Sequence, residues 1–333
     1  MLERVQHAVT LIYSSYRLDK SASRYTIVCI NLKRMDTDME NAGKPLKFGG
    51  EWTAEKLELV RKYLCAYTTA LKNQPFKLVY IDAFAGTGYC GKGEGEVPET
   101  QIIPELAESE AQAFLKGSAR TALEVEPQFH NFIFIDHDIS NCAELSNLGD
   151  EYPDLKNRIT VINADANTYL QELAKRNWLR QGERAVLFLD PYAMQVEWST
   201  IQAVAQTQAI DMWYLFPLAA VNRLLRRDAE IDDAWRQRLD RIFGTNDWET
   251  AFYQRRATQT LFGEEESIEK VATFDGIKNF LLDRLKGEFA DVVPNPVILE
   301  NSRCSPLFLL CFAAGNPKGA PIAVKIARGI LRR

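Results

Sequence analysis

Histidine is scarce in this chain of 333 residues, with three in all, and its six cysteines form no Cys-x-x-Cys pair. Histidine-based metal sites and Ser-His-Asp triads therefore have few candidates. The cysteines lie far apart in mostly apolar stretches, which predicts reduced thiols and a cytoplasmic protein. No run approaches about 18 apolar residues, so we expect no membrane-spanning helix. Residues 1–10 also lack the apolar core of a signal peptide.

An excess of positive charge is missing too. The chain has 40 Lys and Arg residues against 45 Asp and Glu residues, for a net charge of −5. No general basic field therefore attracts nucleic acid, although a local basic patch can suffice. The 46% of hydrophobic residues is ordinary for a globular protein with a sizeable core. The length fits one α/β domain that carries insertions.

The stretch from Leu78 to Gly91 organises the rest of the chain. It begins as an apolar run, meets Asp82 and then breaks into glycines, among them Gly86 and Gly88. This pattern predicts a buried parallel strand and a tight turn at its carboxyl end, where open α/β sheets bind ligands. The stretch contains neither the P-loop pattern nor the complete Gly-x-Gly-x-x-Gly fingerprint. A plain turn after a core strand is the alternative.

The spacing Asp-x-Phe-x-Gly-x-Gly, made by Asp82, Phe84, Gly86 and Gly88, resembles a known loop. It is similar to the S-adenosylmethionine (SAM) loop of amino-group methyltransferases that act on DNA and RNA. Because glycine has no side chain, Gly86 and Gly88 would allow a ligand to approach the backbone closely. The resemblance implies that these four residues bind SAM, with Asp82 orienting the loop or the methionine amino group.

Four more strands are predicted after this loop, and helical segments alternate with them. The strands span residues 131–136, 158–165, 185–189 and 210–217. Together with the first strand, four of the five end at an aspartate: Asp82, Asp136, Asp165 and Asp190. Since parallel strands end on one edge of a sheet, we expect four carboxylates along one rim.

The two middle acids have predicted cofactor roles, each with an alternative. An acid at the end of the second strand is placed to bond ribose hydroxyls, so Asp136 is the candidate for that contact. Asp165 is a candidate for accepting a hydrogen bond from the adenine amino group. Either acid can instead cap the helix that follows it, and Asp138 is the expected cap of the helix from Ile139.

Outside the strands, apolar spacing predicts several helices. One spans 52–72 with Thr53 as its cap, and a short one is expected at 105–114. Another spans 166–179 and buries Leu170 and Leu179. The charged segment 222–285 is predicted to be helical. Its arginines suggest a solvated face or, alternatively, a lid that contacts a polyanionic substrate.

The two ends of the chain have weaker or simpler patterns. Residues 8–13 and 25–30 have the composition of strands, and residues 1–44 form an extension without evident chemistry. Near the other end, two apolar runs at 296–299 and 307–312 are close enough to pair as antiparallel strands. The chain closes with a helix at 320–331.

Asp190-Pro191-Tyr192 supplies the second chemical motif. It resembles the Asp-Pro-Pro-Tyr motif of amino-group methyltransferases, with one proline missing. An exocyclic amine is a poor nucleophile because its lone pair is conjugated with the ring. A carboxylate (Asp190) and a backbone carbonyl (Pro191) that accept its two N–H bonds favour attack, while an aromatic ring (Tyr192) stacks on the base. A strand end followed by an Asp-Pro turn is the structural alternative.

A wider resemblance covers about residues 45–330. The segments 48–53, 80–88, 116–118 and 134–136 and above all 190–198 with 213–217 are similar to the three-Cys-motif partner protein family of bacteria. Members usually carry glycine where this chain has Ala193. The family is named for a neighbouring gene product with a three-cysteine motif, which resembles radical-SAM proteins. The resemblance implies a methyltransferase-like fold and a possible partner.

These observations lead to one prediction of fold and function. We expect residues 45–333 to form a Rossmann-like class I SAM-dependent methyltransferase fold, with a mostly parallel sheet and a helical insertion at about 226–290. The predicted activity is methyl transfer from SAM to an amino group of a nucleic-acid base. Two alternatives stay open: an accessory protein that docks the three-cysteine protein, and a small-molecule N-methyltransferase. The predictions include no metal and no membrane.

Overall fold

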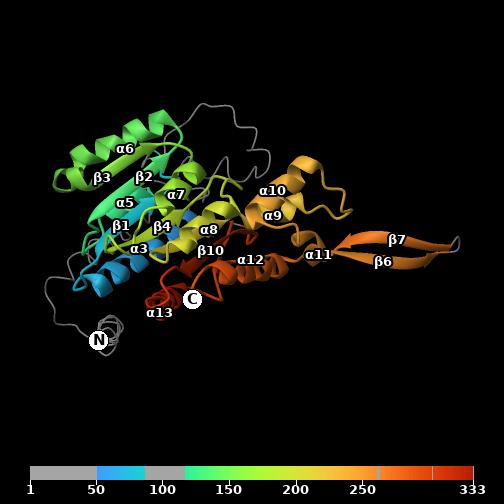
Figure 1. The fold of residues 1–333 in the computed structure, drawn as a ribbon. Coiled ribbons are helices and arrows are strands. Elements are labelled where there is room, and N and C mark those ends of the chain that lie inside the picture. The colour runs from blue at the N-terminus through green and yellow to red at the C-terminus, as the bar shows by residue number, and fades with distance from the viewer. Residues whose placement is uncertain (1–50, 87–116, 261–262, 302, 333) are drawn as a thin grey trace, which may run out of the picture. The chain divides into compact units, whose positions relative to one another are not determined.

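The computed structural model describes residues 51–86, 117–260, 263–301 and 303–332 (Figure 1). The chain divides into two units, Met1–Phe48 and Gly49–Arg333, and the fold below is that of the second. The strands predicted at 8–13 and 25–30, the helix at 105–114 and Gly88 lie outside the described residues. Within those ranges, no helix is long and apolar enough to cross a membrane.

An eight-stranded sheet forms the centre of this unit, in the order β3-β2-β1-β4-β5-β10-β8, with β9 also paired to β10 (Figure 1). Strands β1 to β5 are parallel, and β10 runs antiparallel to β5. This arrangement is the Rossmann-like class I methyltransferase fold, as the sequence predicted. The strands are β1 (Lys77–Asp82), β2 (Asn131–Asp136), β3 (Ile159–Asn163), β4 (Glu183–Leu189), β5 (Ile210–Phe216), β8 (Asp291–Val292), β9 (Val297–Glu300) and β10 (Pro306–Ala314).

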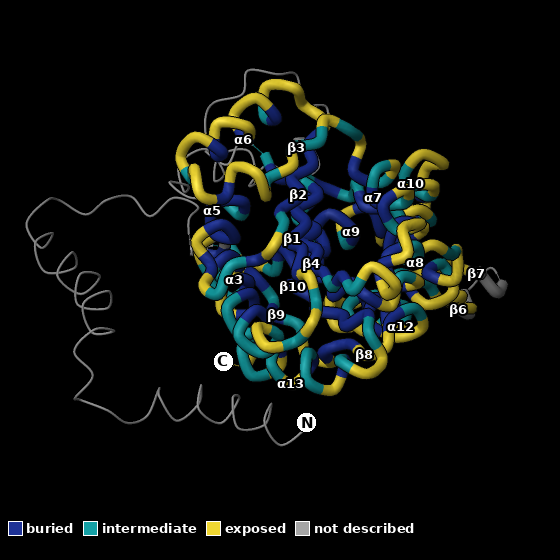
Figure 2. Tube along the Cα trace, turned by 60° about the vertical axis from the view of Figure 1, so that its left-hand side comes forward, coloured by how far each residue is buried: buried dark blue, intermediate teal, exposed yellow. Residues whose placement is uncertain are grey.

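Helices cover both faces of the sheet, and this explains why its central strands are mostly apolar. Helices α3 (Glu51–Leu71), α5 (Ser118–Leu123), α6 (Ile139–Glu151) and α13 (Ala320–Leu331) pack on one face. Helices α7 (Ala166–Ala174), α8 (Trp198–Gln206), α9 (Leu218–Leu224), α10 (Asp233–Phe243) and α12 (Phe274–Glu288) pack on the other. Figure 2 shows the strands buried between helices whose outer faces are exposed.

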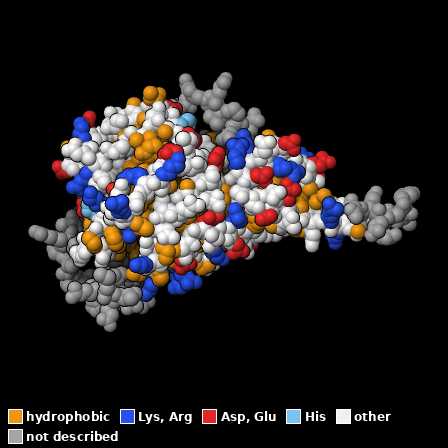
Figure 3. Space-filling model, in the orientation of Figure 1, with side chains coloured by type: hydrophobic (Ala, Val, Ile, Leu, Met, Phe, Trp, Pro, Cys, Tyr) orange, Lys and Arg blue, Asp and Glu red, His pale blue; other side chains and the backbone are white. Residues whose placement is uncertain are grey.

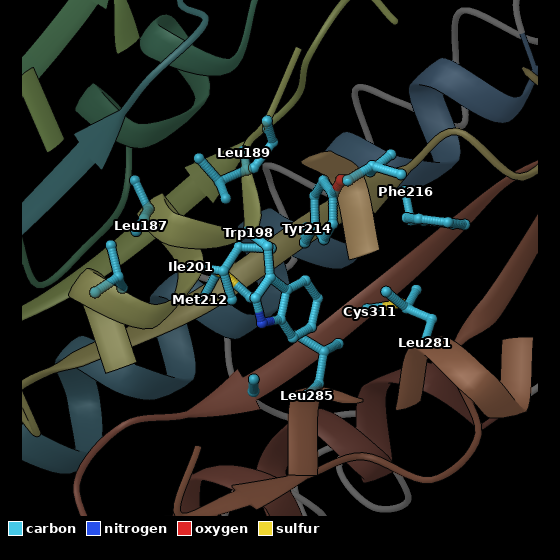
Figure 4. Close-up of a cluster of buried hydrophobic side chains, with 14 of the residues drawn as sticks. Leu187, Leu189, Trp198, Ile201, Met212, Tyr214, Phe216, Leu281, Leu285 and Cys311 are labelled. Atoms are coloured by element: carbon cyan, nitrogen blue, oxygen red, sulfur yellow. The ribbon is translucent and has the colours of Figure 1, made fainter. Parts of the chain in front are cut away.

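Trp198 ties the inserted segment to the sheet. In Figure 4 its indole lies among Met212 of β5 and Leu285 of α12. Its Nε1 donates a hydrogen bond to Glu288 Oε1 at 3.1 Å, and the Arg284 guanidinium lies 4.8 Å from the ring centroid. Because this large ring of α8 is buried against both β5 and α12, the inserted segment shares the hydrophobic core on this face of the sheet.

Several sequence expectations are confirmed at the level of single elements. Helix α13 has the predicted bounds, β9 and β10 are antiparallel, and Asp138 caps α6 by accepting a hydrogen bond from Ser140 N. Two expectations are wrong. Thr53 lies inside α3 and is not its cap. Leu179 is 46% exposed, because α7 ends at Ala174 and the chain turns before residue 179.

The prediction of a helical segment over 222–285 is wrong in part. Helices α9, α10, α11 (Trp248–Phe252) and α12 are present, but an antiparallel hairpin of β6 (Tyr253–Thr260) and β7 (Gly263–Lys270) lies between α11 and α12. The hairpin is held by its backbone ladder and by cross-strand pairs such as Arg256 Nη1 with Glu269 Oε2 at 3.0 Å. Its residues do not alternate between apolar and polar, so the pattern predicted no strand here.

Candidate functional site

The carboxyl ends of the central strands bring the predicted acids to one rim of the sheet. Asp82 is the last residue of β1, Asp136 is the last residue of β2, and Asp190 follows β4 directly. Strand β1 lies between β2 and β4. Asp165 comes two residues after the end of β3. The rim therefore carries three acids on neighbouring strands, with a fourth after the next strand.

The loop after β1 continues across this rim. Ala83 N donates to Phe188 O at 3.2 Å, and Ala85 N donates to Ile135 O at 3.1 Å, so the loop still bonds both neighbouring strands. Gly86 has a φ of +60°, a conformation that glycine adopts without strain. A Cβ added at Gly86 would meet no described atom within 4 Å. Within the described part of the chain, the glycine therefore borders open space at the strand ends.

Asp136 holds the glycine loop in place. Its Oδ2 accepts a hydrogen bond from Gly86 N at 2.9 Å, and its Oδ1 accepts bonds from Asp138 N at 2.8 Å and Asn141 Nδ2 at 3.1 Å. An ionised carboxylate has about four acceptor sites, so a ribose hydroxyl can still bond to it. Beside it, His137 and Ile139 are largely exposed. The ribose role of Asp136 stays a prediction.

Asp165 caps helix α7, which was the alternative to its predicted contact with adenine. Its Oδ1 accepts hydrogen bonds from Thr168 N at 2.8 Å and from Thr168 Oγ1 at 2.9 Å, which fixes the start of α7. A side chain that satisfies the first turn of a helix in this way stabilises it by about 1 kcal/mol. The adenine contact of Asp165 stays a prediction.

Asp82 lies at the predicted strand end, but its side chain is fully buried there. It makes long contacts of 3.4 Å with the Tyr80 hydroxyl and with Phe84 N, so it orients the loop from beneath. Burial raises the pKa of Asp82 to about 7; a hydrogen bond from Ser118 opposes this shift, and the Asp190 charge adds to it. Phe84 is half-buried and packs against the core on the α7–α8 face.

Asp190 makes an ion pair that the sequence did not suggest. Lys56 of α3 places Nζ at 2.5 Å from Asp190 Oδ2, although the two residues are 134 positions apart. Lys56 is buried, and its ammonium lies 5.0 Å from the ring centroid of Trp52. The available signal was helical spacing, because Lys56 falls on the face of α3 that carries Trp52, Val60 and Tyr63, all of which are buried.

A second residue outside the predicted set fixes the loop after Asp190. Asn167 of α7 donates from Nδ2 to Gln195 O at 2.8 Å and accepts at Oδ1 from Glu197 N at 3.0 Å. Gln195 Oε1 in turn accepts from Tyr192 N at 3.2 Å. Tyr192 is half-buried, and Pro191 is buried. The backbone that carries the predicted catalytic motif is therefore held by side-chain amides on both sides.

Comparison with known proteins assigns no family to this chain. No protein-family model and no curated protein matches the chain. Among solved structures, the chain is similar to protein LPL1258 from Legionella pneumophila, of family DUF519, with 14% identity, a TM-score of 0.37, and coverage of 72% of this chain and 93% of that one.

The chain is also similar to yhhF from Escherichia coli, a methyltransferase candidate, with 12% identity, a TM-score of 0.26 and coverage of 64% and 87%. Both TM-scores lie below 0.5. The fold assignment therefore stands on the strand order and strand directions given above.

Proposed function

We propose that this protein is a SAM-dependent N-methyltransferase that acts on an amino group of a nucleic-acid base. The observation that carries the proposal is the rim itself. A glycine loop with open space at Gly86 lies between Asp136 on one neighbouring strand and Asp190 on the other. In an open α/β sheet, this is the edge at which ligands bind.

The residues at the loop fit the proposed cofactor. Gly86 leaves free the space that a Cβ would fill, and Asp136 has acceptor capacity beside its bonds to the loop. Ile139, which is 75% exposed and follows Asp136 closely, offers apolar surface to a purine ring. When bound, SAM supplies an electrophilic methyl group on its sulfonium.

Asp190, Pro191 and Tyr192 are proposed to present the acceptor amine. The Asp190 carboxylate and the Pro191 carbonyl accept its N–H bonds, which frees the nitrogen lone pair from conjugation. The Tyr192 ring stacks on the base and holds the nitrogen in line with the methyl group. On transfer, an N–C bond forms, the S–C bond breaks, and the nitrogen loses one proton to solvent or to Asp190.

Charge on the surface gives the nucleic-acid part of the proposal limited support. Basic and acidic side chains are interspersed over the face shown in Figure 3. Arg223 and Arg227 are exposed at and after α9, the helix that begins at the carboxyl end of β5. Arg226, between them, pairs with Asp228 at 2.6 Å. The arginines of this segment therefore act partly as a solvated, ion-paired surface.

Calorimetry with SAM tests the cofactor claim. We expect the wild type to bind SAM and Gly86→Val to lose binding, because the side chain enters the open space and the φ of +60° strains a branched residue. Gly287→Ala, a change in α12 that also meets no described atom within 4 Å, is the matched control and keeps binding. Absent binding in the wild type, or equal binding in Gly86→Val, contradicts the claim.

Transfer of tritium from methyl-labelled SAM tests the activity. The acceptors are unmodified ribosomal RNA transcripts and DNA from a methylation-deficient host. We expect the wild type to label one of them and Asp190→Ala to lose the label. Binding that weakens with rising salt is expected for a nucleic-acid substrate, whereas binding independent of salt favours a small molecule.

A second candidate function is that of an accessory protein in the three-Cys-motif partner family. The observation that favours it is the Lys56–Asp190 ion pair, which occupies one oxygen of the predicted catalytic carboxylate. In this case the fold docks the three-cysteine protein, and Asp190 has a structural role. A pull-down that captures the three-cysteine protein, together with unchanged methyl transfer in Asp190→Ala, decides in its favour.

A further inference from the structure

Lys56 is a charged residue in an interior position. Its side chain is 7% exposed, and that of Asp190 is 20% exposed. Burial of an ammonium is unfavourable unless a partner of opposite charge compensates for the lost hydration. The partners here are Asp190 Oδ2 at 2.5 Å and the face of the Trp52 ring at 5.0 Å. The ring itself is anchored, because it stacks on Phe308 of β10 with a centroid distance of 4.9 Å.

The direction from which Lys56 reaches Asp190 matters. Helix α3 packs on the sheet through Tyr63 and Leu64, which are fully buried, so Lys56 arrives from the interior side of the strand ends. Asp190 retains some exposure, and among the described residues its Oδ1 accepts no hydrogen bond. One oxygen of the carboxylate is thus held from within, and the other remains available.

We propose that Lys56 is a positioning residue, which fixes Asp190 through Oδ2 so that Oδ1 accepts one N–H of the substrate's amino group. This role rests on the proposed methyltransferase function and deepens it. A carboxylate on an unrestrained side chain rotates among staggered positions, and displacement of a catalytic group by about 1 Å costs about 100-fold in rate. The ion pair removes that freedom and balances the charge of Asp190.

The contrary interpretation is that Lys56 blocks the site by occupying the place of the acceptor amine. The burial of Lys56 and its contact with the anchored Trp52 argue against this, because a blocking amine has to leave when substrate binds. If Lys56 moved away, its buried side chain and the Trp52 ring beside it would become exposed, and Asp190 would lose its counter-charge. The two interpretations predict opposite changes in kcat when the ammonium is removed.

The experiment measures steady-state methyl transfer from tritiated SAM to the ribosomal RNA transcript or DNA that the wild type labels. Lys56→Met removes the charge at similar volume, and Lys56→Arg keeps it. Lys62→Met is the matched control on the same helix, since Lys62 is exposed and pairs with Glu58 at 3.6 Å. Asp190→Asn and the double variant Lys56→Met/Asp190→Asn complete a double-mutant cycle.

We expect Lys56→Met to lower kcat about 100-fold while the KM of the nucleic acid changes by less than about threefold. Lys56→Arg regains part of the loss, and Lys62→Met matches the wild type. The double variant has the same kcat as Asp190→Asn, because Lys56 acts through Asp190. Since the double variant lacks both charges, this comparison holds even where Lys56→Met alone fails to fold.

Three results overturn the role of Lys56. An unchanged kcat in folded Lys56→Met denies positioning, and a raised kcat shows that Lys56 blocks the site. A double variant much slower than Asp190→Asn shows that Lys56 acts elsewhere. If the wild type labels neither the RNA nor the DNA, the proposed function itself fails and this role fails with it.

Discussion

Asp82 makes the stability of the fold depend on pH. The carboxyl group is fully buried at the end of β1, and burial raises its pKa from the ordinary 3.8 to about 7. The folded protein therefore holds this proton over a pH range in which the unfolded chain has released it. The contribution of Asp82 to the free energy of unfolding is greatest below about pH 4, falls as the pH rises, and levels off above about pH 7.

The size of the effect follows from the shift. One pKa unit corresponds to about 1.4 kcal/mol, so a change from 3.8 to about 7 makes the folded state about 4 kcal/mol less stable above pH 7 than below pH 4. Between pH 5 and pH 8 the loss amounts to about 3 kcal/mol. Asp82→Asn keeps the shape and removes the titration. It is therefore expected to lose less stability over that interval.

Urea unfolding of the wild type and Asp82→Asn at pH 5 and pH 8 measures this difference. From pH 5 to pH 8, we expect the free energy of unfolding of the wild type to fall by about 3 kcal/mol more than that of Asp82→Asn. Asp211, which is also buried and has a pKa raised by burial to about 6, contributes the same slope to both proteins and cancels. Parallel loss of stability in the two proteins would refute the reasoning.

Two further changes test the packing and capping of the fold. Gly315→Ala places a Cβ 2.2 Å from the carbonyl oxygen of Ile210. We therefore expect the free energy of unfolding in urea to fall by about 3 kcal/mol or more. Gly287→Ala is the control, because its Cβ meets no described atom within 4 Å. Asp138→Ala removes the cap that bonds Ser140 N at 2.7 Å, and we expect a lowered melting temperature from a loss of about 1 kcal/mol, whereas an unchanged temperature contradicts that role.

The parallel strands could be predicted because both of their faces are buried. A strand such as β4 is apolar from residue 185 to its end at Leu189 and is followed directly by Asp190, so its type and its end are both visible in the sequence. The hairpin of β6 and β7 lacks this signal. Its residues are mostly polar on both faces, and its pairing depends on the backbone ladder and on charge pairs such as Arg256 with Glu269.

At the site, the sequence predicted which acids reach the rim better than it predicted what each one contacts. Asp136, Asp165 and Asp190 all lie near strand ends, but Asp136 and Asp190 each have a partner at a distant position. Asp165 bonds the start of its own helix, while Asp136 bonds the glycine loop 50 residues earlier. A helix cap depends on neighbours in sequence, so that contact could be weighed from the sequence as an alternative, whereas the contacts with Gly86 and Lys56 could not.

Two residues outside the predicted set, Lys56 and Ser118, share a place in the fold. In an α/β sequence, ligand-binding groups are expected among the residues that follow each strand. Yet a helix that precedes a strand runs in the opposite direction and begins at the same rim. Lys56 lies near the start of α3, before β1, and Ser118 is the first residue of α5, before β2. Lys56 pairs with Asp190, and Ser118 bonds Asp82. The starts of these incoming helices therefore supply partners for the acids at the carboxyl ends of β1 and β4.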